Sequence, residues 1–90
     1  MPTICSFAGI SIRMYNREHG PPHFHAYLNN AMIVVDIRTL RVVRGRFPNR
    51  SQSLVLEWAM AKRPDLIANW ESAQQGEPMN PIPPLELSHG

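Results

Sequence analysis

Residues 23–40 read HFHAYLNNAMIVVDIRTL, and this stretch decides the fold. Apolar side chains fill every second position on each side of an Asn-Asn pair: Phe24, Ala26 and Leu28 precede it, and Ile33, Val35 and Ile37 follow it. A period of two is typical of a strand with one buried face. Asn29 and Asn30 tolerate the positive φ angles that a two-residue hairpin turn requires. The stretch therefore predicts an antiparallel hairpin whose two apolar rows form the core.

Shorter runs on both sides of the hairpin predict further strands. Three of them have strand composition: residues 2–9, residues 10–16 and residues 40–45, the last ended by Gly45. Between the second run and the hairpin, Pro21 and Pro22 remove two backbone donors and stiffen the loop. We expect four to five antiparallel strands within residues 1–46.

The apolar period changes to that of a helix beyond residue 48. Residues 52–63 place Leu54 and Trp58 on one stripe, with Asn49 or Ser51 as the expected N-cap. A second amphipathic helix is expected over residues 65–76. Proline is suited to the first turn of a helix and glycine to its end. We therefore expect Pro64 to end the first helix and to be the first residue of the second, with Gly76 at the C-cap of the second.

Strands followed by helices predict an α+β domain. Its antiparallel sheet of four to five strands would carry two helices packed on one face. We expect one domain over residues 1–90, with strands in 1–46, helices in 49–76 and an extended Pro-rich tail in 77–90. The tail can fold back on the domain or dock on a partner.

Cysteine content and hydropathy indicate in which cellular compartment the protein is expected. The single cysteine, Cys5, excludes an intrachain disulfide and fits a reducing compartment. No apolar run approaches 18 residues, and no basic start precedes a long apolar stretch. We therefore expect a cytoplasmic protein without a membrane span.

Charge is distributed unevenly along the chain. Residues 1–50 hold seven arginines against two acids, a net +5, whereas residues 51–90 hold two basic residues against five acids, a net −3. Arginine suits phosphate and carboxylate recognition. The candidate binding residues are Arg13, Arg17, Arg38, Arg41 and Arg44. RNA is one candidate partner, and the alternative is that these charges only solvate the surface.

A corner before the hairpin, residues 17–27 (REHGPPHFHAY), holds three of the four histidines. Strand alternation would place His23 and His25 on the face opposite the core, in a row with a tyrosine. The Pro-Pro pair would limit where the preceding loop can lie. The candidate catalytic residues are Glu18, His19, His23, His25 and Tyr27.

Three interpretations of this corner remain open. His19, His23 and His25 could hold a divalent metal such as zinc, although no cofactor is required by the pattern. Two imidazoles could instead divide acid and base roles on RNA without a metal, with Arg13 and Arg17 at the phosphates. The third interpretation is a structural corner, or a rim for a partner protein.

Several segments together resemble one family of small bacterial proteins. They are the start MPTI, the corner EHGPPHFH, the segment RGRFPNR, the pattern LVLEWA…RPDLIANWE and the ending PIPPLE. The chain is similar in these segments to the domain-of-unknown-function family numbered four thousand one hundred and sixty. The resemblance implies no established activity. It implies a frequent gene neighbour, a second small protein, in pairs that look like toxin–antitoxin modules.

Three functional hypotheses follow. The first is a toxin-like component of a two-protein module, acting on RNA or translation through the histidine cluster and bound by an antitoxin-like partner. The second is a non-enzymatic module that binds a protein or forms a homo-oligomer. The third is a small metal-binding protein.

Overall fold

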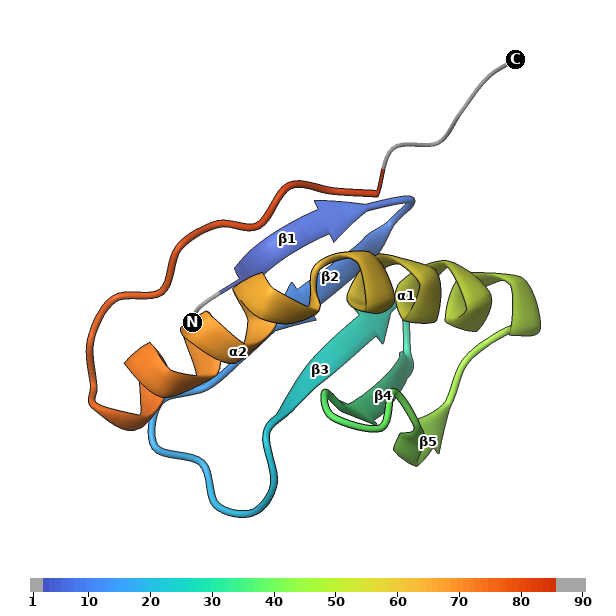
Figure 1. Ribbon diagram of the computed structural model, residues 1–90. Helices are drawn as coiled ribbons and strands as arrows, with labels where there is room; N and C mark the ends of the chain where they lie inside the picture. Colours follow the sequence, from blue (N-terminus) through green and yellow to red (C-terminus); the bar gives the residue numbers. More distant parts are fainter. Residues whose placement is uncertain (1–2, 86–90) are drawn as a thin grey trace.

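Five strands and then two helices make up the fold (Figure 1). The computed structural model describes residues 3–85. The elements are β1 (Thr3–Phe7), β2 (Ile10–Arg13), β3 (His23–Leu28), β4 (Ala31–Asp36), β5 (Val42–Arg46), α1 (Asn49–Ala61) and α2 (Arg63–Gln74). The sheet has the order β1-β2-β3-β4-β5, and every neighbouring pair is antiparallel. The predicted α+β class is therefore confirmed.

The hairpin that decides the fold forms as predicted. Leu28 pairs with Ala31 across a two-residue turn, in which Asn29 has a φ of 53°. This turn sets the register of the whole β3–β4 pair, so that Phe24 faces Val35. Both side chains of that pair are fully buried.

The last strand differs from the prediction in one respect. Gly45 does not end the strand, because β5 continues to Arg46. Gly45 has a φ of 85°, and a Cβ built on it would lie 2.0 Å from the carbonyl oxygen of Met32. Glycine is therefore required here by the close approach of β4 as well as by the backbone conformation.

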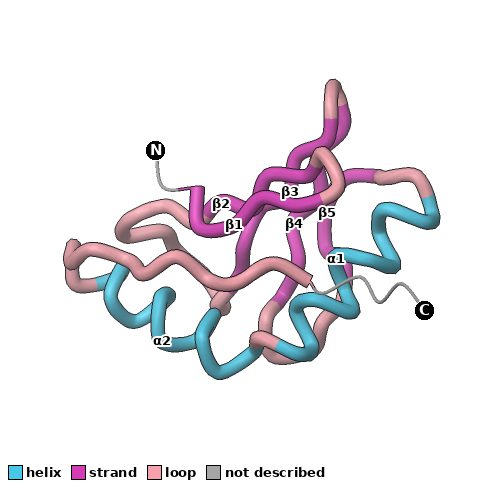
Figure 2. The backbone as a smooth tube through the Cα atoms, turned by 90° about the horizontal axis from the view of Figure 1, so that it is seen from above, coloured by secondary structure: helices cyan, strands magenta, loops and turns pink. Residues whose placement is uncertain are grey.

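Both helices cover one face of the sheet (Figure 2). Trp58 of α1 is fully buried and meets the Phe24 ring edge-on, with centroids 5.7 Å apart. Trp70 of α2 is 7% exposed and belongs to the same apolar cluster. Both tryptophans therefore anchor the packing of the helices on the sheet. None of the helices in residues 3–85 is long and apolar enough to cross a membrane.

The predicted N-cap of the first helix is wrong. Pro48 occupies the N-cap of α1 and no side chain caps the helix, so neither Asn49 nor Ser51 has the expected role. The reason is that Pro48 is extended and its carbonyl already accepts the first helical hydrogen bond, from Gln52. Gly76, with a φ of 70°, follows the C-cap of α2 directly.

The Pro-rich tail is extended over residues 77–85 and lies against its own domain. The Ile82 amide donates to the carbonyl of Ile4 in β1 (2.8 Å), and the Trp58 indole donates to the carbonyl of Pro83 (2.9 Å). Ile82 is 4% exposed and joins the core. The rest of the predicted tail, residues 86–90, lies outside the described residues.

Candidate functional site

The loop before β3 is held against the end of α2. The backbone amide of Arg17 donates to the carbonyl of Ala73 (3.1 Å), and the side-chain amide of Gln74 donates to the carbonyl of Glu18 (3.0 Å). Arg17 itself has a φ of 57°. Because α2 holds the backbone of both Arg17 and Glu18, the Glu18 side chain is directed back toward the sheet.

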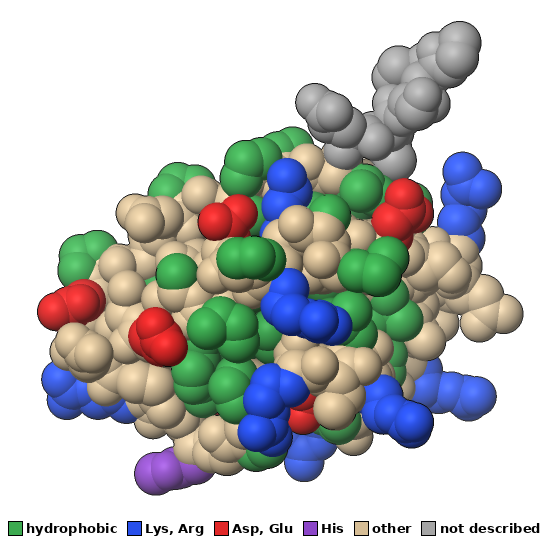
Figure 3. Space-filling model, in the orientation of Figure 1, with side chains coloured by type: hydrophobic (Ala, Val, Ile, Leu, Met, Phe, Trp, Pro, Cys, Tyr) green, Lys and Arg blue, Asp and Glu red, His purple; other side chains and the backbone are tan. Residues whose placement is uncertain are grey.

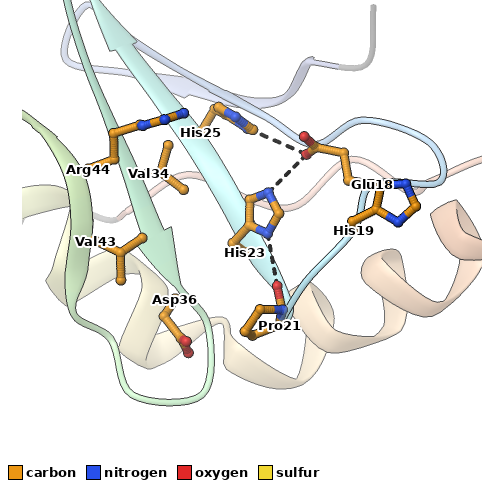
Figure 4. Close-up of a pocket in the computed structure, with 9 residues that line it drawn as sticks. All are labelled: Glu18, His19, Pro21, His23, His25, Val34, Asp36, Val43 and Arg44. Atoms are coloured by element: carbon orange, nitrogen blue, oxygen red, sulfur yellow. Dashed lines mark hydrogen bonds and ion pairs between the residues drawn. The ribbon is translucent and has the colours of Figure 1, made fainter.

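Strand β3 presents its histidines on the face turned away from the helices, as predicted. Phe24 and Ala26 are fully buried, whereas His23, His25 and Tyr27 alternate with them and are only partly buried. The imidazole centroids of His23 and His25 lie 5.4 Å apart. The Glu18 carboxylate reaches both rings from the loop (Figure 4).

Three ligand atoms converge at this corner. Glu18 Oε1 lies 3.0 Å from His23 Nε2 and 3.8 Å from His25 Nδ1, and all three atoms lie within 4.8 Å of one another. Glu18 Oε1 and His25 Nδ1 are buried, yet neither makes a hydrogen bond. His19, expected among the metal ligands, is not part of this group, and Glu18 takes its place.

The His23 ring is oriented from two sides. Its Nδ1 lies 2.8 Å from the carbonyl oxygen of Pro21, which can only accept, so Nδ1 carries the proton. Its ring also packs against Trp70, with centroids 5.1 Å apart. The predicted stiff corner thus has a defined effect, because the Pro21 carbonyl directs Nε2 of His23 toward Glu18.

His25 is held in a less polar setting. Burial lowers the pKa of His25 below its ordinary value, and the neighbouring Glu18 carboxylate opposes this shift only in part. The Tyr15 ring packs edge-on against the imidazole, with centroids 4.9 Å apart. At neutral pH this setting favours the neutral imidazole, which can accept a proton or bind a metal ion.

A cavity of about 370 Å³ opens beside the converging atoms. It is lined by Glu18, His19, Pro21, His23, His25, Val34, Asp36, Val43 and Arg44 (Figure 4). Arg44 reaches this face because of an irregularity in the β4–β5 pairing between Val34 and Val35. His25 pairs with Val34, and Val34 pairs with Arg44, so the three residues form one row across the sheet. Arg44 is the one arginine of the lining and shares it with the carboxylates of Glu18 and Asp36.

The two tyrosines form a wall of the site. Their hydroxyls hydrogen-bond to each other at 2.9 Å, and the Arg13 guanidinium lies 4.6 Å above the Tyr27 ring. The hydrogen bond between Tyr27 and Tyr15 raises the pKa of Tyr27 to about 12. Tyr27 therefore stays protonated at neutral pH, and the position of Arg13 on its ring leaves that face closed to a stacking base.

The remaining candidates are spread around the corner. His19 is exposed and lines the cavity. Arg17 is exposed, and its guanidinium lies against Gly76 at the end of α2. Arg38 and Arg41 lie in the connection between β4 and β5, outside the cavity lining. Of the five binding candidates, only Arg44 lines the cavity.

Several site residues were missed by sequence reasoning. Asp36 faces His23 across the β3–β4 pair, and Val34 faces His25. A two-residue turn pairs positions symmetrically, so the hairpin signal could have revealed both. Asp36 Oδ1 accepts hydrogen bonds from the amides of Arg38 and Thr39, and these bonds hold the pKa of Asp36 below its usual value.

The sequence comparison places this corner inside a family. Residues 9–71 match the family described as Domain of unknown function (DUF4160), and the chain belongs to that family. The resemblance found in the sequence is thereby confirmed. No curated protein and no solved structure matches the chain.

Proposed function

We propose that the protein is a cytoplasmic, toxin-like member of a two-protein bacterial module that acts on RNA at the cavity beside Glu18, His23 and His25. The observation that carries the proposal is the convergence of one carboxylate and two imidazoles next to Arg44. Groups of this kind, gathered in a cleft, are typical of catalytic sites.

The charge of the surrounding surface supports an RNA ligand. Arg44 and Arg46 are exposed on β5, and Arg50 is exposed at the start of α1. Figure 3 shows Lys and Arg side chains gathered on the side of the molecule where β5 lies. Such a surface can hold phosphates without reading sequence.

The proposed reaction is cleavage of an RNA phosphodiester. The 2′-oxygen attacks phosphorus as its proton passes to a base at the corner, and the bond from phosphorus to the 5′-oxygen breaks. The 5′-oxygen then takes up one proton. Arg44 would stabilise the charge that develops on the phosphate oxygens. General acid–base groups contribute about 10²–10⁴-fold to such reactions.

The test is expression of the chain alone in bacteria, together with an RNA cleavage assay on the purified protein. Three proteins are compared: the unchanged chain, the double variant His23→Ala with His25→Ala, and the control His19→Ala. The proposal expects the unchanged chain and the control to slow growth and cleave RNA. Unimpaired growth, or toxicity that survives in the double variant, would contradict it.

A second candidate is a non-enzymatic binding module, favoured by the outer edge of β5. Within residues 3–85, no strand pairs with that edge, and Val43 on it is 61% exposed. Strand addition by a second small protein or another copy of this chain would cover it. In that case Val43→Lys would abolish association, measured by sedimentation velocity, while His23→Ala would leave it unchanged.

A further inference from the structure

We infer that Glu18 Oε1, His23 Nε2 and His25 Nδ1 hold one divalent transition-metal ion of the zinc type, with its remaining position open to the cavity. This inference concerns the same site as the proposed function and rests on it for any catalytic meaning. Ion binding itself follows from the geometry, the hydrogen bonding and the donor types of the three side chains.

The separations of the donor atoms fit a shared ion. Ligands bound at about 2.0–2.1 Å in a tetrahedral arrangement lie about 3.3 Å from each other. The distance from Glu18 Oε1 to His23 Nε2 is 3.0 Å, and the distance to His25 Nδ1 is 3.8 Å. These two values bracket the expected one. The third separation, between the two imidazole ligand atoms, lies within 4.8 Å, so the rings must approach by up to about 1.5 Å to complete the arrangement.

The hydrogen bonding distinguishes an ion from a shared proton. A protonated His23 would form an ion pair with Glu18 across the 3.0 Å between Nε2 and Oε1. A proton there would also leave the buried Nδ1 of His25 unpaired. An ion placed among the three atoms accepts a lone pair from each of them.

The surroundings already match those of bound histidines. A metal-binding histidine usually donates its other ring N–H to a backbone carbonyl or carboxylate. His23 does so through Nδ1 and the Pro21 carbonyl, which leaves Nε2 as the free ligand atom. Gln74 holds the Glu18 backbone in place.

The donor set indicates the class of ion. Two imidazole nitrogens and one carboxylate oxygen suit zinc or a ferrous ion, whereas magnesium and calcium prefer oxygen ligands throughout. Three protein ligands with an open position are typical of catalytic sites. The open side faces the cavity, where the ion and Arg44 together would outweigh the charges of Glu18 and Asp36, so an anionic group such as a phosphate would be drawn there.

The first experiment measures metal binding by tag-free protein. Elemental analysis of the purified chain is followed by removal of metal with a chelator and titration with zinc against a competing indicator. We expect one ion per chain. Glu18→Gln and His25→Ala should each weaken binding by at least about 100-fold, beyond the loss that removal of an outer contact causes. His19→Ala, from the same cavity, should bind as the unchanged chain does.

Trp70 provides an independent readout of where the ion binds. Its ring lies 5.1 Å from that of His23, so a cobalt or copper ion at this site should quench its fluorescence. The quenching should disappear in Glu18→Gln, whose circular dichroism spectrum verifies folding. It should also disappear in Trp70→Phe, since Trp58 packs instead against Phe24.

Each result supports or overturns the inference. Uptake of one ion that is lost in Glu18→Gln and His25→Ala supports it, whatever the RNA assay gives. Uptake well below one ion per chain, or equal binding by Glu18→Gln and the unchanged chain, overturns it. RNA cleavage that persists in excess chelator, together with uptake well below one ion per chain, would overturn the metal site and leave the proposed function intact. Metal binding without RNA cleavage would support the metal site and contradict the proposed function.

Discussion

Two polar regions border α2, and they differ in how their hydrogen bonds are satisfied. Asn69 is 2% exposed, and its side-chain amide donates to the carbonyl of Asn80 (2.7 Å) and accepts from the amide of the same residue (2.9 Å). At the other region, Glu18 Oε1 and His25 Nδ1 are buried without such partners. Buried polar atoms are nearly always paired, so the exceptions mark a site that another group completes.

The difference separates a structural contact from a functional one. Asn69 and Asn80 bind the tail to α2 and need nothing further. The group of Glu18, His23 and His25 is held just as firmly by its surroundings, yet its free donor atoms point at one another. We therefore expect changes at Asn69 to affect stability alone, and changes at Glu18 to affect ligand binding above all.

The largest expected effect on stability lies in neither polar region. Trp58→Ala should lower the free energy of unfolding by about 3–5 kcal/mol, because it removes a large buried side chain. The loss also frees the Pro83 carbonyl from the indole. Urea denaturation measures the change. Met60→Ala on the same helix is the control, and its effect should stay within about 0.5 kcal/mol since Met60 is 65% exposed.

The second-largest expected effect is stabilisation of the fold by zinc. It should depend on the group of Glu18, His23 and His25. At a free concentration 100-fold above its Kd, zinc should raise the free energy of unfolding by about 2.7 kcal/mol. In Glu18→Gln, whose binding is at least about 100-fold weaker, the same addition should raise the free energy of unfolding by no more than about 0.4 kcal/mol, seen as a much smaller Tm shift. A Tm shift of equal size in both proteins would mean that zinc binds elsewhere and that the contrast between the two regions has no functional content.

Asn69→Ala should lower the free energy of unfolding by about 1–3 kcal/mol, because it leaves the backbone groups of Asn80 without partners. Asn80→Ala is the matched control. The contact uses only the backbone of Asn80, so this substitution should change stability by no more than about 0.5 kcal/mol. Thermal melts with and without zinc should show the same zinc response in both variants.

The smallest effect is expected at the wall of the site. Tyr27→Phe removes the hydrogen bond to the partly exposed Tyr15 hydroxyl, and it should lower the free energy of unfolding by about 1 kcal/mol or less. The zinc stoichiometry should stay at one. Loss of the ion in this variant would show that the hydroxyl belongs to the binding group.

The contrast also indicates how far the site was predictable. Strand alternation placed His23 and His25 on one face, because β3 buries every second residue. The turn at Asn29-Asn30 determines which residues of β4 face them. Arg44 could not be assigned in the same way. Without the irregularity between Val34 and Val35, the alternation of β5 would have turned it to the other face.

Glu18 marks the limit of sequence reasoning at this corner. The sequence identified it as a neighbour of His19 and as a catalytic candidate, while one of the three interpretations took the three histidines as metal ligands. Its position depends on Ala73 and Gln74, which hold the loop from a helix more than fifty residues later in the chain. No local pattern encodes such a contact, since it exists only after α2 has packed.

The sequence by itself determined the order of strands and helices, the buried rows and the face that carries the histidines. These follow from local periodicity and turn chemistry, which neighbouring residues specify together. Only the tertiary structure decided that Glu18, and not His19, joins the two imidazoles, that Arg44 shares their cavity, and that the tail lies on its own domain. Each of these depends on contacts between segments far apart in the chain, whose relative placement follows from packing.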